Sequence, residues 1–277
     1  MGDHFCAFSF VDRITAFESG LGAHAEFAVP GDIAAFPSCL VAEAVGQLAA
    51  WVAMDQVSFR GRPVAALANE TRFLGVVRPG DRLTLEVRIQ SCDDEAVAYG
   101  GSASVDGVRV IELEDCLGPM LPVADFDSPQ VLADRLALLR GPGAVPGRFR
   151  GVAATPVDVS ASAAADSVVA TLLVPESAPY FGDHFPRRPV FPATLLLDAQ
   201  IGLAMRLAAP GAVPVRMTHV KVRSFTTPGQ VLQIEARRAP GDKNLLHLSA
   251  QRDGKTVATA RLEVAAAGVY PAPRGAA

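Results

Sequence analysis

Two stretches of the sequence follow the same pattern and constrain the fold more than any other feature. Residues Ala35–Met54 and Ala193–Leu207 are each apolar on nearly every side when drawn as a helix. A proline stands near the start of each, Pro37 in the first and Pro192 in the second. A helix that is apolar all round is buried inside a larger structure rather than laid on its surface. The chain therefore needs enough sheet to surround two such helices.

The two stretches belong to a longer internal repeat. Turn signals also recur in the two halves. Arg78–Asp81 corresponds to Thr227–Gln230, and Asp106 corresponds to Asp253, with a glycine after each aspartate. At an offset of 155 residues, the helices match at Pro37 and Pro192, Leu40 and Leu195, Glu43 and Asp198, and Ala44 and Ala199. Self-similarity of this kind indicates a duplicated structural unit. We predict an α+β fold in which each half wraps an antiparallel sheet around its own buried helix.

Composition shifts divide the chain into three parts. We predict an N-terminal unit over residues 1–122, a linker over 123–150 and a C-terminal unit over 151–277. The linker holds a short helical pattern followed by a loop rich in Gly and Pro. In the first unit, short strands and loops are expected over residues 1–34, then strands at Pro63–Ala68, Thr71–Val77, Arg82–Ile89, Ala96–Val105 and Val108–Asp115. In the second unit, strands are expected at Pro156–Asp158, Ser167–Val174, Val215–Val222, Gln230–Arg237, Leu245–Gln251 and Thr256–Val264.

Charge and cysteine usage argue against several functions. The formal net charge is -4 and no basic run of five residues occurs, which disfavours nucleic acid as a partner. The longest apolar stretch, Leu40–Met54, contains Glu43 and Gln47 and is too short to span a bilayer. The N-terminus lacks a basic region followed by an apolar core, so we expect no secretory signal. Four cysteines without CxxC or metal spacing favour a reducing cytoplasm and no metal site.

The segment HFPRRPVFPATLLLDA, residues 184–199, resembles the β-hydroxyacyl-acyl-carrier-protein dehydratases, whose pattern is roughly HFPG-x-PV-x-PG-x-L-x-x-E/D-A. The first-half segment PSCLVAEAVGQ, residues 37–47, resembles the helix of the same family. The resemblance implies a hot-dog fold, an antiparallel sheet around a central helix. Two such units in one chain imply a double hot-dog, a pseudo-dimer like that of polyketide dehydratase domains.

The resemblance also implies how a catalytic site is assembled, because paired hot-dogs take the histidine from one unit and the acid from the other. His184 matches the family histidine, and Glu43 matches the family acid, with Gln47 four residues later. The first-half position that matches His184 is Val29, so only one site is complete. The acid of the second half, Asp198, is expected to be structural and bonded to nearby amides.

The residue types suit removal of water from a 3-hydroxyacyl thioester. Histidine titrates near neutral pH, so His184 can take the α-proton as a base. A carboxylic acid in an apolar tunnel has a raised pKa, so Glu43 can protonate the leaving hydroxyl. The N–H groups of Ala193 and Thr194, at a helix start, can stabilise the enolate oxygen. Gln47 is expected to orient Glu43 or its water, and Tyr180 to support the segment.

Two positions depart from the family pattern. Arg187 replaces the glycine after HFP, and Ala193 replaces the glycine after the second proline. Arg187 either disturbs the oxyanion geometry or substrate entry, or serves a different purpose. With Arg188 it can bind an acidic carrier protein or the phosphopantetheine phosphate, and a solvated basic edge is the alternative.

The sequence thus predicts a cytoplasmic 3-hydroxyacyl-acyl-carrier-protein dehydratase of fatty-acid or polyketide synthesis. Its expected partner is the acyl carrier protein, and the acyl group is attached to the phosphopantetheine of that protein. No metal or redox cofactor is expected. A hot-dog thioesterase that uses a helix carboxylate and water, and a non-catalytic acyl-carrier-binding protein, remain alternatives. Double-bond isomerisation with the same residues also remains open. The oligomeric state is a monomeric pseudo-dimer or a homodimer.

Overall fold

The computed structural model describes residues 4–160, 166–266 and 268, and its strands pair antiparallel throughout. The first half contains β1 (Arg13–Glu18), β2 (Gly22–Ala28), α1 (Ser38–Gln56), β3 (Gly61–Pro63), β4 (Leu67–Phe73), β5 (Arg82–Cys92), β6 (Ala96–Val105) and β7 (Val108–Pro122). The connecting segment contains the short 3-10 helix η1 (Val123–Asp125) and the helix α2 (Pro129–Arg140). The second half contains β8 (Val157–Val159), β9 (Ser167–Leu173), η2 (Pro179–Gly182), α3 (Ala193–Ala204), β10 (Ala212–Val222), β11 (Val231–Ala239), β12 (Asp242–Arg252) and β13 (Lys255–Ala266).

The strands of both halves form one continuous sheet with the same order on either side of a central seam. From β4 outward the first half runs β7, β6, β5, β2 and β1, and from β10 outward the second half runs β13, β12, β11, β9 and β8. The short strand β3 pairs with the end of β7. Apart from β3, each strand of one half therefore has a counterpart in the other, at the same place in the chain and in the sheet.

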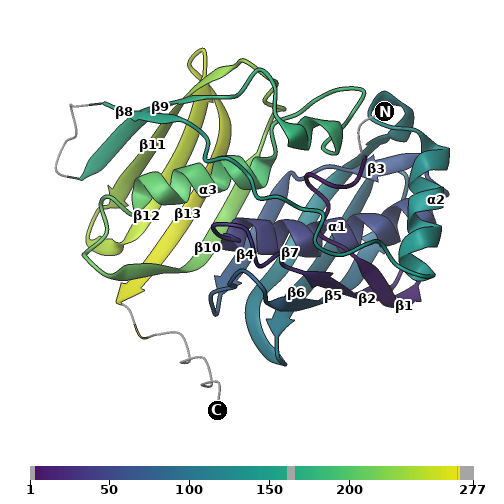
Figure 1. Cartoon of the computed structure of the whole chain (residues 1–277). Helices are drawn as coiled ribbons and strands as arrows, with labels where there is room; N and C mark the ends of the chain where they lie inside the picture. The colour runs from purple at the N-terminus through teal and green to yellow at the C-terminus, as the bar shows by residue number, and fades with distance from the viewer. Residues whose placement is uncertain (1–3, 161–165, 267, 269–277) are drawn as a thin grey trace.

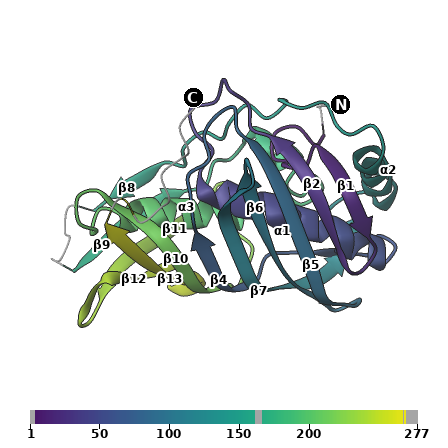
Figure 2. The same ribbon diagram turned by 90° about the horizontal axis from the view of Figure 1, so that it is seen from below.

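The two long helices lie on the same side of this sheet, α3 against the second half and α1 against the first (Figure 1). Seen from below, the strands curve around α1 and α3 (Figure 2). Helix α1 is buried on several sides, as its apolar sequence predicts. Side chains that are 2% exposed or less include Leu40, Val41, Ala44, Val45, Leu48, Ala49, Val52 and Ala53. Burying these side chains against β2, β5 and β6 supplies much of the apolar core of the first half.

Helices α1 and α3 both begin directly after a proline, and neither start is capped by a side chain. Pro37 and Pro192 occupy the N-cap positions, and no side-chain hydrogen bond to either helix start is present among the described residues. The first backbone N–H groups of a helix have no partner within the helix. The start of α3 therefore carries unpaired donors at the junction of the two halves.

Two expected strands, Pro63–Ala68 and Thr71–Val77, are wrong in their boundaries. Residue Pro63 ends β3, because the partner of the chain changes there from the end of β7 to β10 and an earlier part of β7. The single strand β4 then runs over Leu67–Phe73. Beyond it, the N–H groups of Leu74 and Gly75 both donate to the carbonyl of Val110, which ends the regular ladder.

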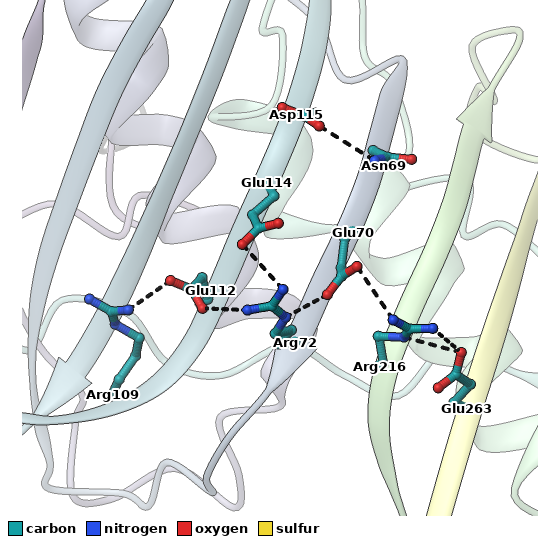
Figure 3. A network of polar contacts seen from close by, with 9 residues as sticks. All are labelled: Asn69, Glu70, Arg72, Arg109, Glu112, Glu114, Asp115, Arg216 and Glu263. Carbon is teal, nitrogen blue, oxygen red and sulfur yellow. Dashed lines mark hydrogen bonds and ion pairs between the residues drawn. The ribbon is translucent and has the colours of Figure 1, made fainter.

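The seam joins β4 to β10 along their length, with Thr71 opposite Met217 and Ala68 opposite Val220. A chain of charged side chains crosses the same seam (Figure 3). Arg216 on β10 lies 2.6 Å from Glu263 and 3.6 Å from Glu70 on β4. From Glu70 the network continues through Arg72, Glu112, Glu114 and Arg109 across the first half.

The connecting segment also packs against the first half. Helix α2 packs against β1 at the outer edge of the first half (Figure 1). Its buried side chains are Leu132, Leu136 and Leu139, spaced three or four residues apart as on one face of a helix. Within the described residues, no helix is both long enough and apolar enough to cross a membrane.

Candidate active site

A cavity of about 230 Å³ lies between the two halves and runs beside α1. The α1 residues that line it share one face of the helix: Cys39, Ala42, Glu43, Gly46, Gln47, Ala50, Trp51 and Met54. The second half contributes His184, Phe185, Val190, Phe191, Ala193 and Thr194. Because α1 and α3 are in contact, residues far apart in the sequence face one cavity. The predicted acid and the predicted histidine thus line the same cavity from different halves.

The carboxyl group of Glu43 is held by two donors. Gln47, one turn later on α1, donates from Nε2 to Oε1 of Glu43 at 3.1 Å. The hydroxyl of Thr194 donates to Oε2 at 2.9 Å. Burial raises the pKa of Glu43, while these two hydrogen bonds and the charge of Arg62 partly oppose the rise. The net upward shift favours a protonated carboxyl group compared with an exposed glutamate.

Gln47 is fixed in turn by the N-terminal segment of the chain. Its Oε1 accepts the N–H of Phe10 at 2.9 Å, and its Nε2 also donates to the carbonyl of Phe8 at 3.0 Å. These bonds set the orientation of the amide, so Nε2 points at Glu43 while Oε1 points away. The N-terminal segment therefore determines how the acid of the site is held.

His184 follows η2 and turns into the cavity. Its N–H donates to the carbonyl of Tyr180 at 2.7 Å, and its Nδ1 lies 2.8 Å from the carbonyl of Val190. A carbonyl can only accept, so the neutral ring carries its proton on Nδ1 and leaves a lone pair on Nε2. Burial lowers the pKa of His184 to about 4, and the charge of Arg62 acts in the same direction. The ring is therefore neutral at physiological pH and able to accept a proton.

The start of α3 faces the same space. Ala193 and Thr194 line the cavity, and their N–H groups lie in the uncapped first turn of the helix. Unpaired N–H groups and the positive end of the helix dipole favour negative charge at this point. The arrangement can stabilise an oxyanion next to His184 and Glu43.

The other sequence-predicted residues lie outside the cavity wall. Tyr180 is buried and packs on Phe181, with ring centroids 4.7 Å apart, and its carbonyl holds the N–H of His184. Arg187 is exposed and directs its guanidinium to the carbonyl of Ala124 at 2.9 Å. Its φ is not in the left-handed region, so a side chain here causes no backbone strain.

Arg188 is also exposed, and it contacts a residue of the cavity wall. Its guanidinium is 5.4 Å from the ring of Phe225, a residue that lines the cavity. It is 5.8 Å from the ring of Phe126 in the connecting segment. Arg188 therefore stands outside the cavity, beside one of its wall residues.

Asp198 and Val29 do not join this cavity. Asp198 borders a second hollow, which Pro37, Leu40 and residues 150–155 also line. Among the described residues its carboxyl group has no hydrogen bond, so the expected bonds to amides are wrong, and burial raises its pKa. Val29 is 3% exposed and belongs to the core. Among the residues that the structure describes, no histidine borders this second hollow.

Arg62 was not predicted from the sequence. It comes from β3, lines the cavity, and its guanidinium carbon lies 4.5 Å from the centre of the Phe185 ring. Its Nη1 is 3.5 Å from Asp127 of the connecting segment. Burial lowers the pKa of Arg62, and the nearby carboxylates Asp127, Glu43 and Asp183 oppose that change. No motif surrounds Arg62 in the sequence, so nothing local distinguishes it from a surface arginine.

The N-terminal segment and α2 also form part of the wall, which the sequence did not predict. Phe5, Phe8 and Val11 line the cavity, as do Leu132, Arg135 and Leu139 of α2. The segment is anchored by Asp183, whose two carboxylate oxygens accept the N–H groups of Phe5 and Phe8. The ring of Phe8 meets His184 edge-on at 5.6 Å. Within the described residues, no cluster of His, Cys, Asp or Glu suited to a metal ion is found.

Comparison with known proteins gives two family models, one on each half. A FabA-like domain model matches residues 31–114, and an ApeI dehydratase model matches residues 160–261. The 3-hydroxyacyl-(acyl-carrier-protein) dehydratase FabZ of Bacillus subtilis (strain 168) is 34% identical over 122 residues. This match covers 40% of the present chain and 86% of the Bacillus protein.

Solved structures resemble nearly the whole chain. An acyl-ACP thioesterase from Bacteroides thetaiotaomicron aligns with a TM-score of 0.56 at 9% identity, covering 87% of this chain and 97% of that one. A 12:0-ACP thioesterase from Umbellularia californica aligns with a TM-score of 0.56 at 11% identity, covering 90% and 99%. At such identities the likeness extends to the fold alone, and that fold is of the hot-dog type.

Proposed function

Because the chain belongs to the 3-hydroxyacyl-(acyl-carrier-protein) dehydratase family, we propose that it removes water from a 3-hydroxyacyl thioester carried on an acyl carrier protein. The product is the 2-enoyl thioester. The observation that carries the proposal is the meeting of Glu43, His184 and the start of α3 around one cavity. These are the acid, the base and the oxyanion donors that the reaction needs.

In the proposed mechanism, Nε2 of His184 takes the proton from the α-carbon. The electrons of that C–H bond pass into the thioester as an enolate, whose oxygen is stabilised by the N–H groups of Ala193 and Thr194. The enolate then forms the carbon–carbon double bond, and the C–O bond at the β-carbon breaks. Glu43 gives its proton to the departing oxygen, which leaves as water. Loss of the imidazolium proton and reprotonation of Glu43 restore the site for the next turnover.

We propose that the chain is a double hot-dog, a pseudo-dimer with one working site. The division is residues 1–122, a linker over 123–150 and residues 151–277. Support comes from the matching strand order of the halves and from the end of β7 at Pro122. The residues that would form the second site, Asp198 and Val29, do not line one cavity. Because one chain supplies both members of the pair, a monomer is sufficient for activity, and a homodimer is compatible with it.

The substrate arrives on phosphopantetheine, and the protein is proposed to need no cofactor of its own. Arg187 and Arg188, both exposed, are proposed to meet the carrier protein or the phosphate of its arm. The position of Arg188 beside the cavity-wall residue Phe225 supports this role. A cytoplasmic site of action is proposed, because no disulfide joins the four cysteines, which all lie in the described part of the chain. The pathway is of the fatty-acid or polyketide type.

The test is an assay of enoyl product from 3-hydroxyacyl-carrier substrates with three variants. His184→Ala and Glu43→Gln are each expected to lower kcat by about 10²- to 10⁴-fold, the usual contribution of a general acid or base. Asp198→Asn is the matched control, because it alters the corresponding acid of the other helix and is expected to leave kcat unchanged. Release of free acid that survives His184→Ala would point to a thioesterase instead. Tight binding of the acyl carrier without turnover by the unaltered protein would point to a carrier-binding role.

A further inference from the structure

The cavity beside α1 is open at one end and closed at the other. Leu67 and Leu117, which pair with each other at the start of β4, line it and are 40% and 38% exposed, so the cavity meets solvent at this end. At the opposite end Met54, Leu132 and Leu139 are each 2% exposed or less. Two of these three belong to α2, so the connecting helix closes the cavity. An acyl chain that enters past Leu67 and Leu117 would end against α2.

Arg135 is the charged residue that α2 places at this closed end. Its guanidinium carbon lies 4.9 Å from the centre of the Phe5 ring, and Phe5 lines the cavity as Arg135 does. Its Nε is buried, and among the described residues it has no hydrogen-bond partner. A buried N–H group without a partner is unfavourable.

The acids near Arg135 are already engaged elsewhere. Asp12 accepts the N–H of Ala28 at 2.8 Å, and Asp183 accepts the N–H groups of Phe5 and Phe8. Both carboxylates act on the charge of Arg135 from a distance, together with Cys6 and the cation Arg148. Across the described residues, no ion pair within 4 Å joins Arg135 to a carboxylate. A ligand oxygen at the closed end would supply the missing acceptor.

We propose that Arg135 binds an oxygen-bearing group at the far end of the acyl chain. This inference rests on the proposed dehydratase function and specifies its substrate class: acyl groups that end in a carboxylate or another strong hydrogen-bond acceptor, rather than in a methyl group. The ring of Phe5 is 6.2 Å from the ring of Trp51 and 4.9 Å from the guanidinium carbon of Arg135, so we place Arg135 nearest the Trp51 end of the cavity wall. Trp51 follows Glu43 by eight residues of helix, or about 12 Å along the axis. The acceptor is therefore expected about 12 Å beyond the reacting carbons.

The experiment compares 3-hydroxyacyl-carrier substrates of matched length that end in a carboxylate or in a methyl group, over a series of lengths. The unaltered protein is expected to show the higher kcat/KM with the carboxylate at the optimal length. Arg135→Met, which keeps an unbranched side chain and removes the charge, is expected to lower that preference by about 10- to 100-fold. Turnover of the methyl-ended substrate serves as the internal measure of correct folding, because it should be retained.

Arg140→Met is the matched control. Arg140 lies on the same helix and also stacks on an aromatic ring, that of Phe17 at 4.4 Å, but it does not line the cavity. This variant should leave the carboxylate preference unchanged. A preference ratio that is the same in Arg135→Met and in the unaltered protein would overturn the proposal.

A second measurement separates failure of this inference from failure of the proposed function. Acyl-pantetheine amides that lack the 3-hydroxyl group and end in a carboxylate or a methyl group cannot react, and their dissociation constants are measured by calorimetry. If no substrate is dehydrated, the proposed function fails while the binding preference still decides the role of Arg135. Equal affinity of both amides for the unaltered protein would contradict the inference even if dehydration occurs.

Discussion

The carboxyl group of Glu43 illustrates how one residue depends on both halves of the molecule. Its oxygens accept one hydrogen bond from Gln47 of its own helix and one from Thr194 at the start of the other helix. Both donors favour the charged form, whereas burial favours the protonated form and prevails. The pKa of Glu43 thus depends on the balance between burial and these hydrogen bonds, and replacing a single donor side chain can change it.

Replacing Thr194 by valine should move the pH dependence of the reaction. Loss of the hydroxyl removes a bond that stabilises the carboxylate, so the pKa of Glu43 rises further. If Glu43 is the acid, its active, protonated form then persists to higher pH. The alkaline limb of kcat/KM should shift upward by about one pH unit, the equivalent of one hydrogen bond to a charged group. Thr194→Ser keeps the hydroxyl and should leave the limb in place, and an equal shift in both variants would contradict the assignment.

His4 shows the opposite response to its surroundings from His184. Its Nε2 lies 3.1 Å from Asp127 and its Nδ1 lies 3.6 Å from Asp183. Burial alone would lower the pKa of His4, but the hydrogen bonds to the two carboxylates outweigh it and raise the pKa to about 9. His4 is therefore charged at neutral pH and fastens the N-terminal segment to the connecting segment.

The stabilising effect of His4 should disappear at alkaline pH. Because the folded pKa lies above the unfolded value, the contribution is complete below about pH 6.5 and is lost as pH rises through 9. We expect His4→Gln to lower the free energy of unfolding by about 2 kcal/mol at pH 6 and by much less at pH 10. Urea unfolding of both proteins at the two pH values measures this difference. A deficit that is equal at both pH values would contradict the ion-pair account.

Only part of the site could be predicted at the scale of residues. His184 and Glu43 lie in the two segments that resemble the dehydratase family, and that resemblance implies their pairing across the halves. Arg62 and Arg135 reach the cavity from β3 and from α2, elements with no counterpart at the repeat offset. Their side chains become relevant only through tertiary contacts with Phe185 and Phe5, and no local pattern encodes such contacts.

At the scale of elements, α1 depends on a close approach to the sheet beneath it. Gly101 of β6 lies under the helix, and a Cβ placed there would come within 2.7 Å of Val45 and within 2.6 Å of the carbonyl of Glu86. Atoms do not approach so closely, so any side chain at this position must push α1 or the neighbouring strand away. The glycine thus fixes the height of α1 above the sheet.

Gly101→Ala is expected to lower the free energy of unfolding by about 1 to 3 kcal/mol through overpacking. The contrasting substitution is Gly202→Ala in α3, where a new Cβ would meet no heavy atom within 4 Å beyond the adjacent backbone of its own helix. That change should raise stability by about 0.5 to 1 kcal/mol, because alanine favours the helix. Urea titrations of both variants provide the measurement, and destabilisation of similar size in both would rule out the packing argument.

The elements themselves were largely predictable, because alternation and turn signals are local properties. The strand expected at Ala96–Val105 agrees with β6, and the linker pattern agrees with α2. The strands between Pro63 and Val77 differ from those that the sequence predicts, because their boundaries depend on a change of partner between β3 and β4. Helix α3 ends at Ala204, sooner than its apolar sequence suggested. Partner exchange of this kind leaves no trace in local periodicity.

At the scale of the whole molecule, the two halves are joined by a shared sheet rather than by side chains alone. The ladder between β4 and β10 gives the seam its backbone hydrogen bonds, with Met217 and Val220 buried at it. The charged network above it is partly exposed, and such pairs contribute little each, about 0 to 1 kcal/mol. The strength of the seam therefore comes from the strand pairing and the apolar contacts beneath it.

The shared sheet has a consequence for genetic complementation. When a histidine and an acid come from separate identical subunits, mixing two different inactive mutants regenerates some intact sites in mixed dimers. Here the seam between β4 and β10 lies within one chain, and so do His184 and Glu43. We expect cells or extracts that contain both His184→Ala and Glu43→Gln chains to remain inactive. Restored dehydratase activity in the mixture would mean that halves are exchanged between chains. The functional unit encoded by the gene would then be an assembly rather than a single polypeptide.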